Sequence, residues 1–406
     1  MEIEVAAGVY WVGAIDWNVR NFHGYTYTTP RGTTYNAYLV IDEKIALVDT
    51  VAPSFAGEMV RRIRELIEPE RIDYLIANHG EIDHSGAISE VLNLAPKAQL
   101  ICSEKGKDSL GKCLRPDPDF QAVGTGDKIG LGQRSLTFIE APMLHWPDSM
   151  FTYIEEEALL LPNDAFGQHL ATAERFADQL PDWLVMEEAA RYYANILLPF
   201  SPLVVKKIAE IQEMGIPIDT IAPSHGLIWR KNPGQIIETY LRWARGDFKP
   251  KVLVVYETMW GSTEKIARAL IEGLLSEGVE AALYGLPMAD RSEVIKELLD
   301  AKGILVGSST HNRRMLLNMA AFLEDLIGLR PEGRLGAAFG SYGWGSRAVK
   351  EMEEALKEAK IEVIESDLAI KWAPDEEERA RAVEFGRRFA RQVKGSLSRM
   401  RNSKEG

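Results

Sequence analysis

The fold of this chain is decided around one stretch, Asn78-His79-Gly80-Glu81-Ile82-Asp83-His84-Ser85-Gly86. The apolar run at residues 72–77 predicts a buried strand before it, and the residues after Ser85 predict the start of a helix. In extended backbone, residues two apart face the same way, so His79, Glu81 and Asp83 can converge, while the turn into His84 points neighbouring side chains to different sides. This geometry suits two metal ions better than one. The alternative is that Asp83 caps a helix and the other groups are ordinary polar loop residues.

Composition limits the class of protein. The chain has 406 residues, of which 46% are hydrophobic and 26% charged, so we expect two domains of ordinary size. A formal charge of -13 argues against nucleic acid or an anionic membrane as the main partner, because both need clustered Lys and Arg. The N-terminus lacks the features of a signal peptide and no apolar span is of membrane length, so we expect a cytoplasmic protein. Only Cys102 and Cys113 are present, and they form no Cys-x-x-Cys pair, so any metal must be bound through nitrogen and oxygen.

The first half predicts an α/β sandwich of two sheets. A helix with apolar residues at helical spacing is expected at residues 55–67. Strands are expected at residues 9–15, 36–41, 44–48, 72–77, 99–102, 127–129, 135–141, 150–154, 158–161 and 218–222. Many strands with helices outside them fit two packed sheets. The polar segment 245–251 marks the domain boundary, which gives domains at residues 1–248 and 249–406.

Three further candidate ligands follow later strands. His145, Asp164 and His225 each come directly after a predicted strand, in loops that contain proline. Taken singly, each is better explained as an ordinary loop or turn residue. The repeated placement strengthens the case, because loops at one end of a sheet can bring their side chains to a common point. The candidate metal ligands are His79, Glu81, Asp83, His84, His145, Asp164 and His225.

The second half begins with a continuous apolar strand at residues 252–256. It runs into the loop Glu257-Thr258-Met259-Trp260-Gly261-Ser262-Thr263 and then into a helix. Hydroxyl and backbone N–H groups at a helix N-terminus form an anion site. The loop has neither the Gly-x-x-x-x-Gly-Lys pattern of nucleoside triphosphate sites nor the Gly-x-Gly-x-x-Gly pattern of dinucleotide sites. A single monoester phosphate is therefore the ligand that fits best.

Strand and helix patterns then alternate to residue 393, which predicts five strands in an open doubly wound sheet. Ligands of such sheets bind beyond the carboxyl ends of the strands. Three strand exits combine small polar residues with aromatic rings able to flank a flat heterocycle, although each ring alone is better explained by packing. The candidate cofactor residues are Thr258, Met259, Trp260, Gly261, Ser262, Thr263, Ser308, Ser309, Thr310, His311, Asn312, Ser341, Tyr342, Gly343, Trp344 and Gly345. The polar residues 395–406 are expected to be frayed.

The metal loop resembles the His-x-His-x-Asp-His motif of the metallo-β-lactamase superfamily, with Glu81 in place of one histidine. A carboxylate in place of an imidazole makes the site harder and favours iron over zinc, although affinity order alone does not decide the metal. Glu81 is also the pattern of the flavodiiron proteins (A-type flavoproteins), which join a metallo-β-lactamase-like αββα sandwich to a flavodoxin-like domain with a doubly wound parallel sheet. The resemblance covers nearly the whole chain and includes Trp17-Asn18-Val19-Arg20-Asn21-Phe22-His23-Gly24, Leu144-His145-Trp146-Pro147-Asp148-Ser149-Met150-Phe151 and Asp164-Ala165-Phe166-Gly167-Gln168-His169.

The resemblance implies the ligands of two irons and the groups around them. One iron takes His79, Glu81 and His145, the other takes Asp83, His84 and His225, and Asp164 bridges them. His23, His169 and the pair Tyr192-Tyr193 match positions that line the substrate pocket in the family. From the residues alone, buried polar groups that satisfy one another explain these side chains equally well.

The resemblance to flavodoxin implies FMN, with its phosphate on the first strand exit and its isoalloxazine ring between the second and third. The second exit departs from the usual composition, because His311-Asn312-Arg313-Arg314 is basic and bulky. Those charges can raise the flavin potential or contact an acidic partner, and they leave the flavin contacts in that loop open.

The implied function is a flavodiiron oxidoreductase that reduces nitric oxide to nitrous oxide, dioxygen to water, or both. One alternative is a dizinc hydrolase, which would leave the flavin domain unexplained. Another is an electron carrier with a structural metal domain, against which the complete ligand set argues. No Cys-x-x-Cys pairs follow the flavin domain, so we expect a separate electron donor such as rubredoxin or a reduced deazaflavin. The resemblance also implies a head-to-tail homodimer or a dimer of dimers, with the flavin of one chain against the irons of the other.

Overall fold

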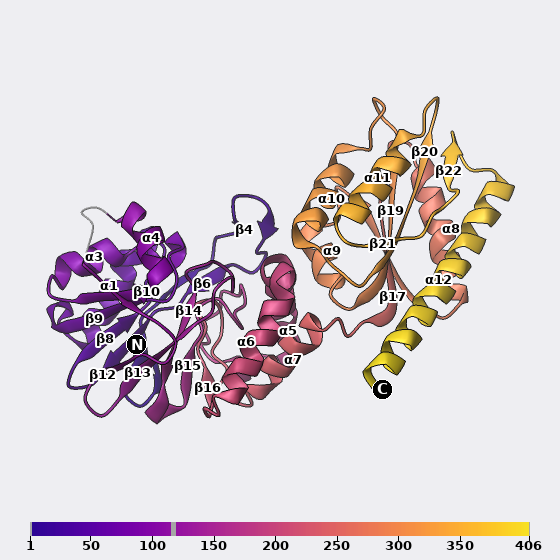
Figure 1. Cartoon of the computed structure of the whole chain (residues 1–406). Helices are drawn as coiled ribbons and strands as arrows, with labels where there is room; N and C mark the ends of the chain where they lie inside the picture. Colours follow the sequence, from indigo (N-terminus) through magenta and orange to yellow (C-terminus); the bar gives the residue numbers. More distant parts are fainter. Residues whose placement is uncertain (1, 115–118, 406) are drawn as a thin grey trace. The chain divides into compact units, whose positions relative to one another are not determined.

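The computed structural model describes residues 2–114 and 119–405, which divide into two compact units (Figure 1). Unit 1 comprises Met1–Tyr193 and Phe200–Leu241, and unit 2 comprises Ala194–Pro199 and Arg242–Gly406. None of the helices in the described ranges has both the length and the apolar composition needed to cross a bilayer.

Unit 1 contains two stacked sheets. The first has the order β1-β2-β7-β8-β9-β10-β11, with β1 (Glu4–Ala6), β2 (Val9–Trp11), β7 (Tyr38–Ile41), β8 (Ile45–Val48), β9 (Ile72–Ala77), β10 (Gln99–Ser103) and β11 (Phe120–Val123). The second has the order β12-β13-β14-β15-β16, with β12 (Lys128–Gly130), β13 (Ser135–Glu140), β14 (Met150–Ile154), β15 (Leu159–Leu161) and β16 (Thr220–Ile221). Two short hairpins pair β3 (Ala14–Asp16) with β6 (Thr33–Tyr35) and β4 (Asn21–Phe22) with β5 (Tyr27–Thr28).

Alternating apolar residues explain why the first sheet is covered on both faces. Val40, Val48 and Ile76 face the second sheet and pack against its Phe138 and Leu161. Their neighbours along the strands point the other way, toward the apolar sides of α1 (Ala56–Leu66), α3 (Ile88–Leu94) and α4 (Glu104–Cys113). Figure 1 shows α5 (Asp182–Tyr192), α6 (Ser201–Glu213) and α7 (Gly234–Ala244) gathered beside the second sheet. Unit 1 is therefore the predicted αββα sandwich, of metallo-β-lactamase type.

Unit 2 is the predicted flavodoxin-like doubly wound sheet. Its strands are β17 (Lys249–Glu257), β18 (Glu280–Leu286), β19 (Ala301–Ser309), β20 (Leu335–Tyr342) and β21 (Glu362–Val363), in the parallel order β18-β17-β19-β20-β21. The helices are α8 (Ser262–Ser276), α9 (Arg291–Glu297), α10 (Leu317–Leu329), α11 (Arg347–Glu358) and α12 (Glu376–Glu405). The strand order reverses beside β17, so the carboxyl ends of β17, β19 and β20 border a crevice in which ligands bind.

Four details differ from the sequence predictions. The strand expected at residues 9–15 is two strands, β2 and β3, which pair in different sheets. The segment expected to link the domains is shorter, because β17 begins at Lys249. A further strand, β22 (Ala369–Lys371), pairs with the end of β20. The frayed end expected at residues 395–406 is wrong as far as residue 405, because α12 continues there.

Candidate functional site

Loops at the strand ends of unit 1 carry all the predicted metal ligands. β9 leads into the loop with His79 and Glu81, and the short helix α2 (Ile82–Ser85) carries the next two. The remaining three, His145, Asp164 and His225, follow β13, β15 and β16. Glu81 is partly exposed and the other ligand candidates are buried. Strands far apart in sequence thus deliver these polar groups to one buried place.

Four side chains converge on a first point. The Oε2 atom of Glu81 lies 3.3 Å from His79 Nε2 and 3.3 Å from His145 Nε2. The Oδ2 atom of Asp164 lies 3.4 Å from His145 Nε2 and 3.7 Å from His79 Nε2. One potential ligand atom from each residue lies within 4.8 Å of the others.

A second point lies on the other side of Asp164. The two carboxylate oxygens of Asp83 lie 3.4 Å from His84 Nε2 and 3.2 Å from His225 Nε2. The Oδ1 atom of Asp164 lies 3.1 Å from His84 Nε2 and 3.5 Å from His225 Nε2. Each oxygen of Asp164 therefore faces a different group of donors, which is the arrangement of a bridging carboxylate.

The two groups fit metal ions in spacing and in chemistry. Two ligand atoms about 2.1 Å from one ion lie about 3.0 Å apart at a right angle and about 3.4 Å apart at the tetrahedral angle. The donor separations above fall around these values. Among the described residues, Asp83 Oδ1, His84 Nε2 and Asp164 Oδ2 are buried without a hydrogen-bond partner, a costly arrangement that a bound cation would relieve. The mixed imidazole and carboxylate set suits iron.

The pKa values of the histidines indicate that protons would occupy the site in the absence of metal ions. Burial alone would lower the pKa of His79, but hydrogen bonds with Asp148 and Glu81 raise it to about 9. The pKa of His84 is likewise raised to about 9 and that of His145 to about 10, against the effect of burial and because carboxylates surround both rings. Without cations, protonated imidazoles balance the carboxylates, so metal ions would replace protons here.

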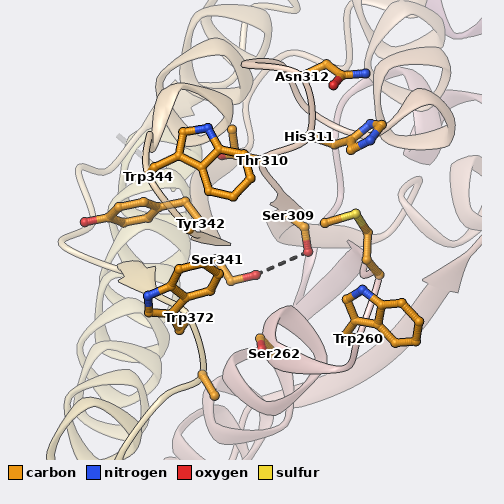
Figure 2. A pocket seen from close by; sticks show the side chains of 13 residues that line it. Trp260, Ser262, Ser309, Thr310, His311, Asn312, Ser341, Tyr342, Trp344 and Trp372 are labelled. Atoms are coloured by element: carbon orange, nitrogen blue, oxygen red, sulfur yellow. Dashed lines mark hydrogen bonds between the residues drawn. The ribbon is translucent and has the colours of Figure 1, made fainter.

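The second candidate site is a pocket of about 440 Å³ at the carboxyl edge of the unit 2 sheet (Figure 2). Figure 2 shows Trp344 and Trp372 on one side of the pocket and Trp260 on the other, with Ser309 and Ser341 between them. The lining residues are Met259, Trp260, Ser262, Ser309, Thr310, His311, Asn312, Ser341, Tyr342, Gly343, Trp344, Trp372 and Ala373. Aromatic walls around a polar floor suit a flat ring system that carries hydrophilic groups.

A buried hydroxyl cluster beneath the polar floor of this pocket joins the ends of three elements. The hydroxyl group of Thr263 lies 3.0 Å from that of Ser309 and 2.9 Å from that of Ser341, which are 3.2 Å apart. Gly261 precedes α8 with a φ of 84°, and no side chain caps this helix. A Cβ at Gly261 would meet nothing within 4 Å, so the helix N-terminus is open to a phosphate group.

Comparison with known proteins assigns the two domains that carry these sites to one protein family. The flavodoxin model matches residues 254–386, and the ODP family beta lactamase model matches residues 33–226. A nitric oxide reductase of Moorella thermoacetica is 53% identical, over 96% of this chain and 98% of the relative. The flavodiiron protein of Giardia intestinalis has a TM-score of 0.92 and 33% identity, over 98% of each chain. The chain belongs to the flavodiiron protein family. Rubredoxin oxygen:oxidoreductase of Desulfovibrio gigas is also similar, with a TM-score of 0.95 and 37% identity over 98% of this chain and 100% of the other.

In this flavodiiron protein, Asp148 supports the first donor group although the sequence analysis did not select it. Its Oδ1 atom lies 3.0 Å from His79 Nδ1, and its Oδ2 atom accepts hydrogen bonds from Gly80 N and Ser109 Oγ, each at 2.8 Å. A carboxylate behind a histidine ligand orients the ring and leaves the other nitrogen for the metal. The signal in the sequence was weak, because Asp148 is one acidic residue in a loop already assigned to His145.

Asp49 is a second residue that the sequence analysis missed. This buried carboxylate accepts hydrogen bonds from Asn78 N at 2.8 Å, Asn78 Nδ2 at 3.1 Å and Asn163 Nδ2 at 3.1 Å. Asn78 and Asn163 immediately precede His79 and Asp164 in the chain. Asp49 therefore fixes two ligand loops relative to each other, and only the tertiary structure shows this connection.

The three side chains predicted to line the substrate pocket lie around the metal site. Tyr192 donates a hydrogen bond of 2.9 Å to Asp164 Oδ1, and burial raises its pKa well above 10. The Nε2 atom of His23 lies 3.3 Å from Glu81 Oε1. His169 is buried with Nδ1 2.7 Å from Thr33 Oγ1, and burial lowers its pKa well below 6.5. The neighbouring residue Tyr193 is instead hydrogen-bonded to Ser201, at 2.9 Å.

Some predicted cofactor residues lie behind the pocket wall. Thr258 Oγ1 accepts a hydrogen bond of 3.1 Å from Gly261 N, and Thr263 belongs to the hydroxyl cluster. Ser308 Oγ accepts a hydrogen bond of 2.9 Å from Leu316 N. These three residues shape the loops and are not among the residues that line the pocket. Gly345 is not a lining residue either. Their contacts with a flavin stay predictions.

Trp372 and Ala373 line the pocket but were not predicted, because they follow the unexpected strand β22. The backbone N–H of Trp372 donates to Tyr342 O at 2.7 Å, and the indole lies 6.3 Å from that of Trp344. The basic segment is partly neutralised, because Arg314 pairs with the buried Glu351 at 2.6 Å. Arg313 is exposed and forms no ion pair with a described residue, so its positive charge is not neutralised within the described part of the chain.

Proposed function

We propose that this flavodiiron protein reduces nitric oxide to nitrous oxide at two irons held by Asp164 and the six other ligand candidates around it, with FMN in the unit 2 pocket as the electron relay. The observation that carries the proposal is the shared carboxylate, because its two oxygens face two separate groups of nitrogen and oxygen donors. The reaction combines two molecules of nitric oxide with two electrons and two protons and gives nitrous oxide and water. When bound, the iron pair supplies a redox-active site where two diatomic molecules meet.

The relatives support this substrate and a second one. The Moorella relative is named a nitric oxide reductase, and the Desulfovibrio relative is named a rubredoxin oxygen:oxidoreductase. Dioxygen is therefore the second candidate. A dizinc hydrolase is disfavoured by the carboxylate at Glu81 and by the aromatic pocket of unit 2, for which hydrolysis has no use.

The residues of the chain orient ligands and hold protons. Asp148 holds His79 through Nδ1, and the backbone carbonyl of Thr34 accepts a hydrogen bond of 2.7 Å from Nδ1 of His225. Each ring thus presents Nε2 to the metal position. Tyr192 remains protonated and donates to the shared carboxylate. We propose that His23 and Tyr192 hold the protons that the reaction consumes, and that His169 keeps the pocket wall closed.

In unit 2, we propose that the FMN phosphate binds at Ser262 and the open N-terminus of α8. We expect the isoalloxazine ring between the second and third strand exits, against the aromatic residues Tyr342 and Trp344, with Trp260 across the pocket. The exposed cation Arg313 would attract an acidic electron donor and favour a reduced, anionic flavin. A separate donor such as rubredoxin or a reduced deazaflavin is expected to deliver the electrons.

We also propose a head-to-tail homodimer, or a dimer of dimers, in which the flavin of one chain serves the irons of the other. Exposed apolar side chains at both sites support this assembly, since Trp260 and Trp344 are each 91% exposed and Ile82, beside Glu81, is 66% exposed. A two-fold interface would cover both sets at once and create two equal electron-transfer pairs.

The function is tested by anaerobic turnover with nitric oxide, compared with dioxygen turnover under the same donor and the same enzyme concentration. We expect nitrous oxide in the ratio of one molecule per two nitric oxide consumed, from protein that holds about two irons and one FMN per chain. Full reductase activity with zinc alone would refute the diiron proposal. If dioxygen is consumed much faster than nitric oxide, dioxygen and not nitric oxide is the main substrate.

The assembly is tested by mixing two inactive variants after dissociation and reassociation. One lacks iron ligands (His79→Ala with His145→Ala), and the other lacks flavin-loop hydroxyls (Ser262→Ala with Thr263→Ala). Each mixed dimer would hold one intact flavin opposite one intact iron pair, so activity should return. Mixed dimers that stay inactive, or a monomer with normal turnover, would contradict the cross-chain arrangement.

A further inference from the structure

Unit 2 has a second pocket, remote from the flavin pocket. Its volume is about 560 Å³, and it is lined by Leu335, Glu362, Ile364, Arg388, Arg391, Gln392, Gly395 and Arg399. Leu335 begins β20, whereas Ser341 and Tyr342 at the end of β20 line the flavin pocket. At about 3.3 Å per residue, the two pockets lie roughly 20 Å apart along this strand. The second pocket therefore belongs to neither of the sites described above.

Helix α12, the yellow C-terminal helix of Figure 1, contributes five of the residues that line this pocket, among them three arginines. Its lining residues Arg388, Arg391, Gly395 and Arg399 recur at helical spacing and so share one face. Gly395 leaves room between the long side chains, since the atom nearest to an added Cβ would be Arg399 Nη1 at 3.9 Å. The opposite wall is formed by the apolar side chains of Leu335 and Ile364, with the acidic Glu362 beside Leu335 in the sheet.

The pocket contains more positive than negative charge. Arg391 pairs with Glu277 at 3.0 Å and is neutralised. Arg388 and Arg399 have no ion pair with any described side chain, and Glu362 is the single acidic residue of the lining set. The chain as a whole is acidic, with a formal charge of -13, so a cavity that two arginines face without an ion pair is locally different in charge from the rest of the protein.

A buried lysine strengthens this observation. Lys302 is 3% exposed, and its Nζ atom donates to Gly333 O and lies 3.3 Å from the sulfur of Met400, with no carboxylate in ion-pair range among the described residues. Burial lowers the pKa of Lys302, the nearby Arg334 lowers it further, Glu362 opposes the change and Arg399 adds to it. The cations at this edge of the sheet therefore repel one another, and an anion in the pocket would relieve the repulsion.

The geometry points to a ligand with several phosphate groups: we propose that the pocket formed by α12 and the start of β20 binds a tripolyphosphate or a nucleoside triphosphate. Guanidinium groups match phosphate oxygens in pairs of hydrogen bonds. Arg388 and Arg399 are eleven residues apart on α12, which is about 16 Å at 1.5 Å per residue, so one phosphate group cannot reach both. The apolar wall of Leu335 and Ile364 offers a surface for a nucleoside.

The test uses the full-length, iron- and FMN-loaded protein and isothermal titration with sodium tripolyphosphate and, separately, with adenosine triphosphate. We expect saturable binding of one ligand per chain that weakens as salt is raised. Arg388→Gln with Arg399→Gln should weaken binding at least tenfold, with unchanged iron and FMN content as the check on folding. Tighter binding of the nucleotide than of tripolyphosphate would assign the apolar wall to the nucleoside, and equal binding would assign the site to polyphosphate alone.

The matched control is Arg379→Gln with Arg381→Gln. Both residues are exposed on α12 and neither lines the pocket, so this variant has the same change in charge and should bind within twofold of the unmodified protein. If both double variants lose the same binding affinity, the effect depends only on net charge, and the proposal is overturned. Absence of saturable binding, or unchanged binding by the pocket variant, would overturn it as well. If the pocket variant does not fold, Arg399→Gln alone is measured against Arg381→Gln alone by the same criteria.

Discussion

Replacing Gly343 by alanine tests how the flavin pocket is built. A Cβ at this position would lie 2.9 Å from two ring atoms of Trp372, closer than carbon atoms approach without displacement. The backbone of Gly343 is not in the left-handed region, so alanine is allowed there and only the contact with the indole changes. The ring must therefore move, and the pocket wall that it forms moves with it.

The size of the effect follows from how freely the indole can move. Overpacking costs about 1–3 kcal/mol, and because Trp372 is 61% exposed its ring can yield, so we expect about 1–2 kcal/mol. At about 1.4 kcal/mol per factor of ten, Gly343→Ala should bind FMN about 5- to 30-fold more weakly. The assay is a titration of flavin-free protein with FMN, in which binding is monitored by the quenching of the flavin fluorescence.

Two further variants make this prediction specific. Gly345→Ala is the control, because a Cβ at Gly345 would meet nothing within 4 Å, and its affinity for FMN should be unchanged. In a Trp372→Leu background the obstacle is absent, so adding Gly343→Ala should cost little more. The reasoning is refuted if Gly343→Ala binds FMN within twofold of the unmodified protein, or if its cost is the same with and without the indole.

Three predictions concern the metal site. Asp148→Asn should lower iron affinity about 10- to 100-fold, because His79 loses its anchoring carboxylate, and metal analysis after dialysis would show iron content below that of the unmodified protein. In the folded, metal-free protein, the pKa values of His79, His84 and His145 are about 9, 9 and 10, above the unfolded value of about 6.5. Protonation of these rings therefore stabilises the folded state fully below about pH 6.5, and this stabilisation is lost as the pH rises through 9 to 10. Denaturant unfolding of the metal-free protein should show this loss, and iron binding at pH 7 should release protons, detected as a dependence of the binding enthalpy on the buffer. Tyr192→Phe removes a hydrogen bond to a carboxylate worth about 1.5–3 kcal/mol, so turnover should fall with little change in FMN content, and unchanged turnover would contradict its role as a proton donor.

Local pattern was sufficient for the elements and for the ligand candidates. Strands such as residues 150–154 were predicted with their observed bounds, because alternation of apolar side chains is a property of neighbouring residues. The seven ligand candidates were found because each follows a strand end, and the structure brings all of them together. The family resemblance supplied the metal, iron, and the assignment of each ligand to one of the two ions, which spacing alone did not determine.

Residues whose role depends on distant partners were missed. Asp49 and Asp148 resemble any loop carboxylate until their hydrogen bonds to the ligand loops are known. Trp372 follows β22, a strand of three residues that forms only by pairing with β20, so no local signal marks it. The end of α12 was predicted to fray because its composition is polar, but the helix continues to residue 405.

The sequence by itself determined which side chains were available and at which strand ends they emerge, since a strand is specified by the order of apolar and polar residues along a few positions. Only the tertiary structure decided which oxygen of Asp164 faces which group, that Trp372 closes the flavin pocket over Gly343, and that two arginines of α12 face a cavity without an ion pair to any described side chain. The physical reason is that these features are distances between groups far apart in the chain. Such distances are set by how sheets and helices pack, not by any property of the residues on their own.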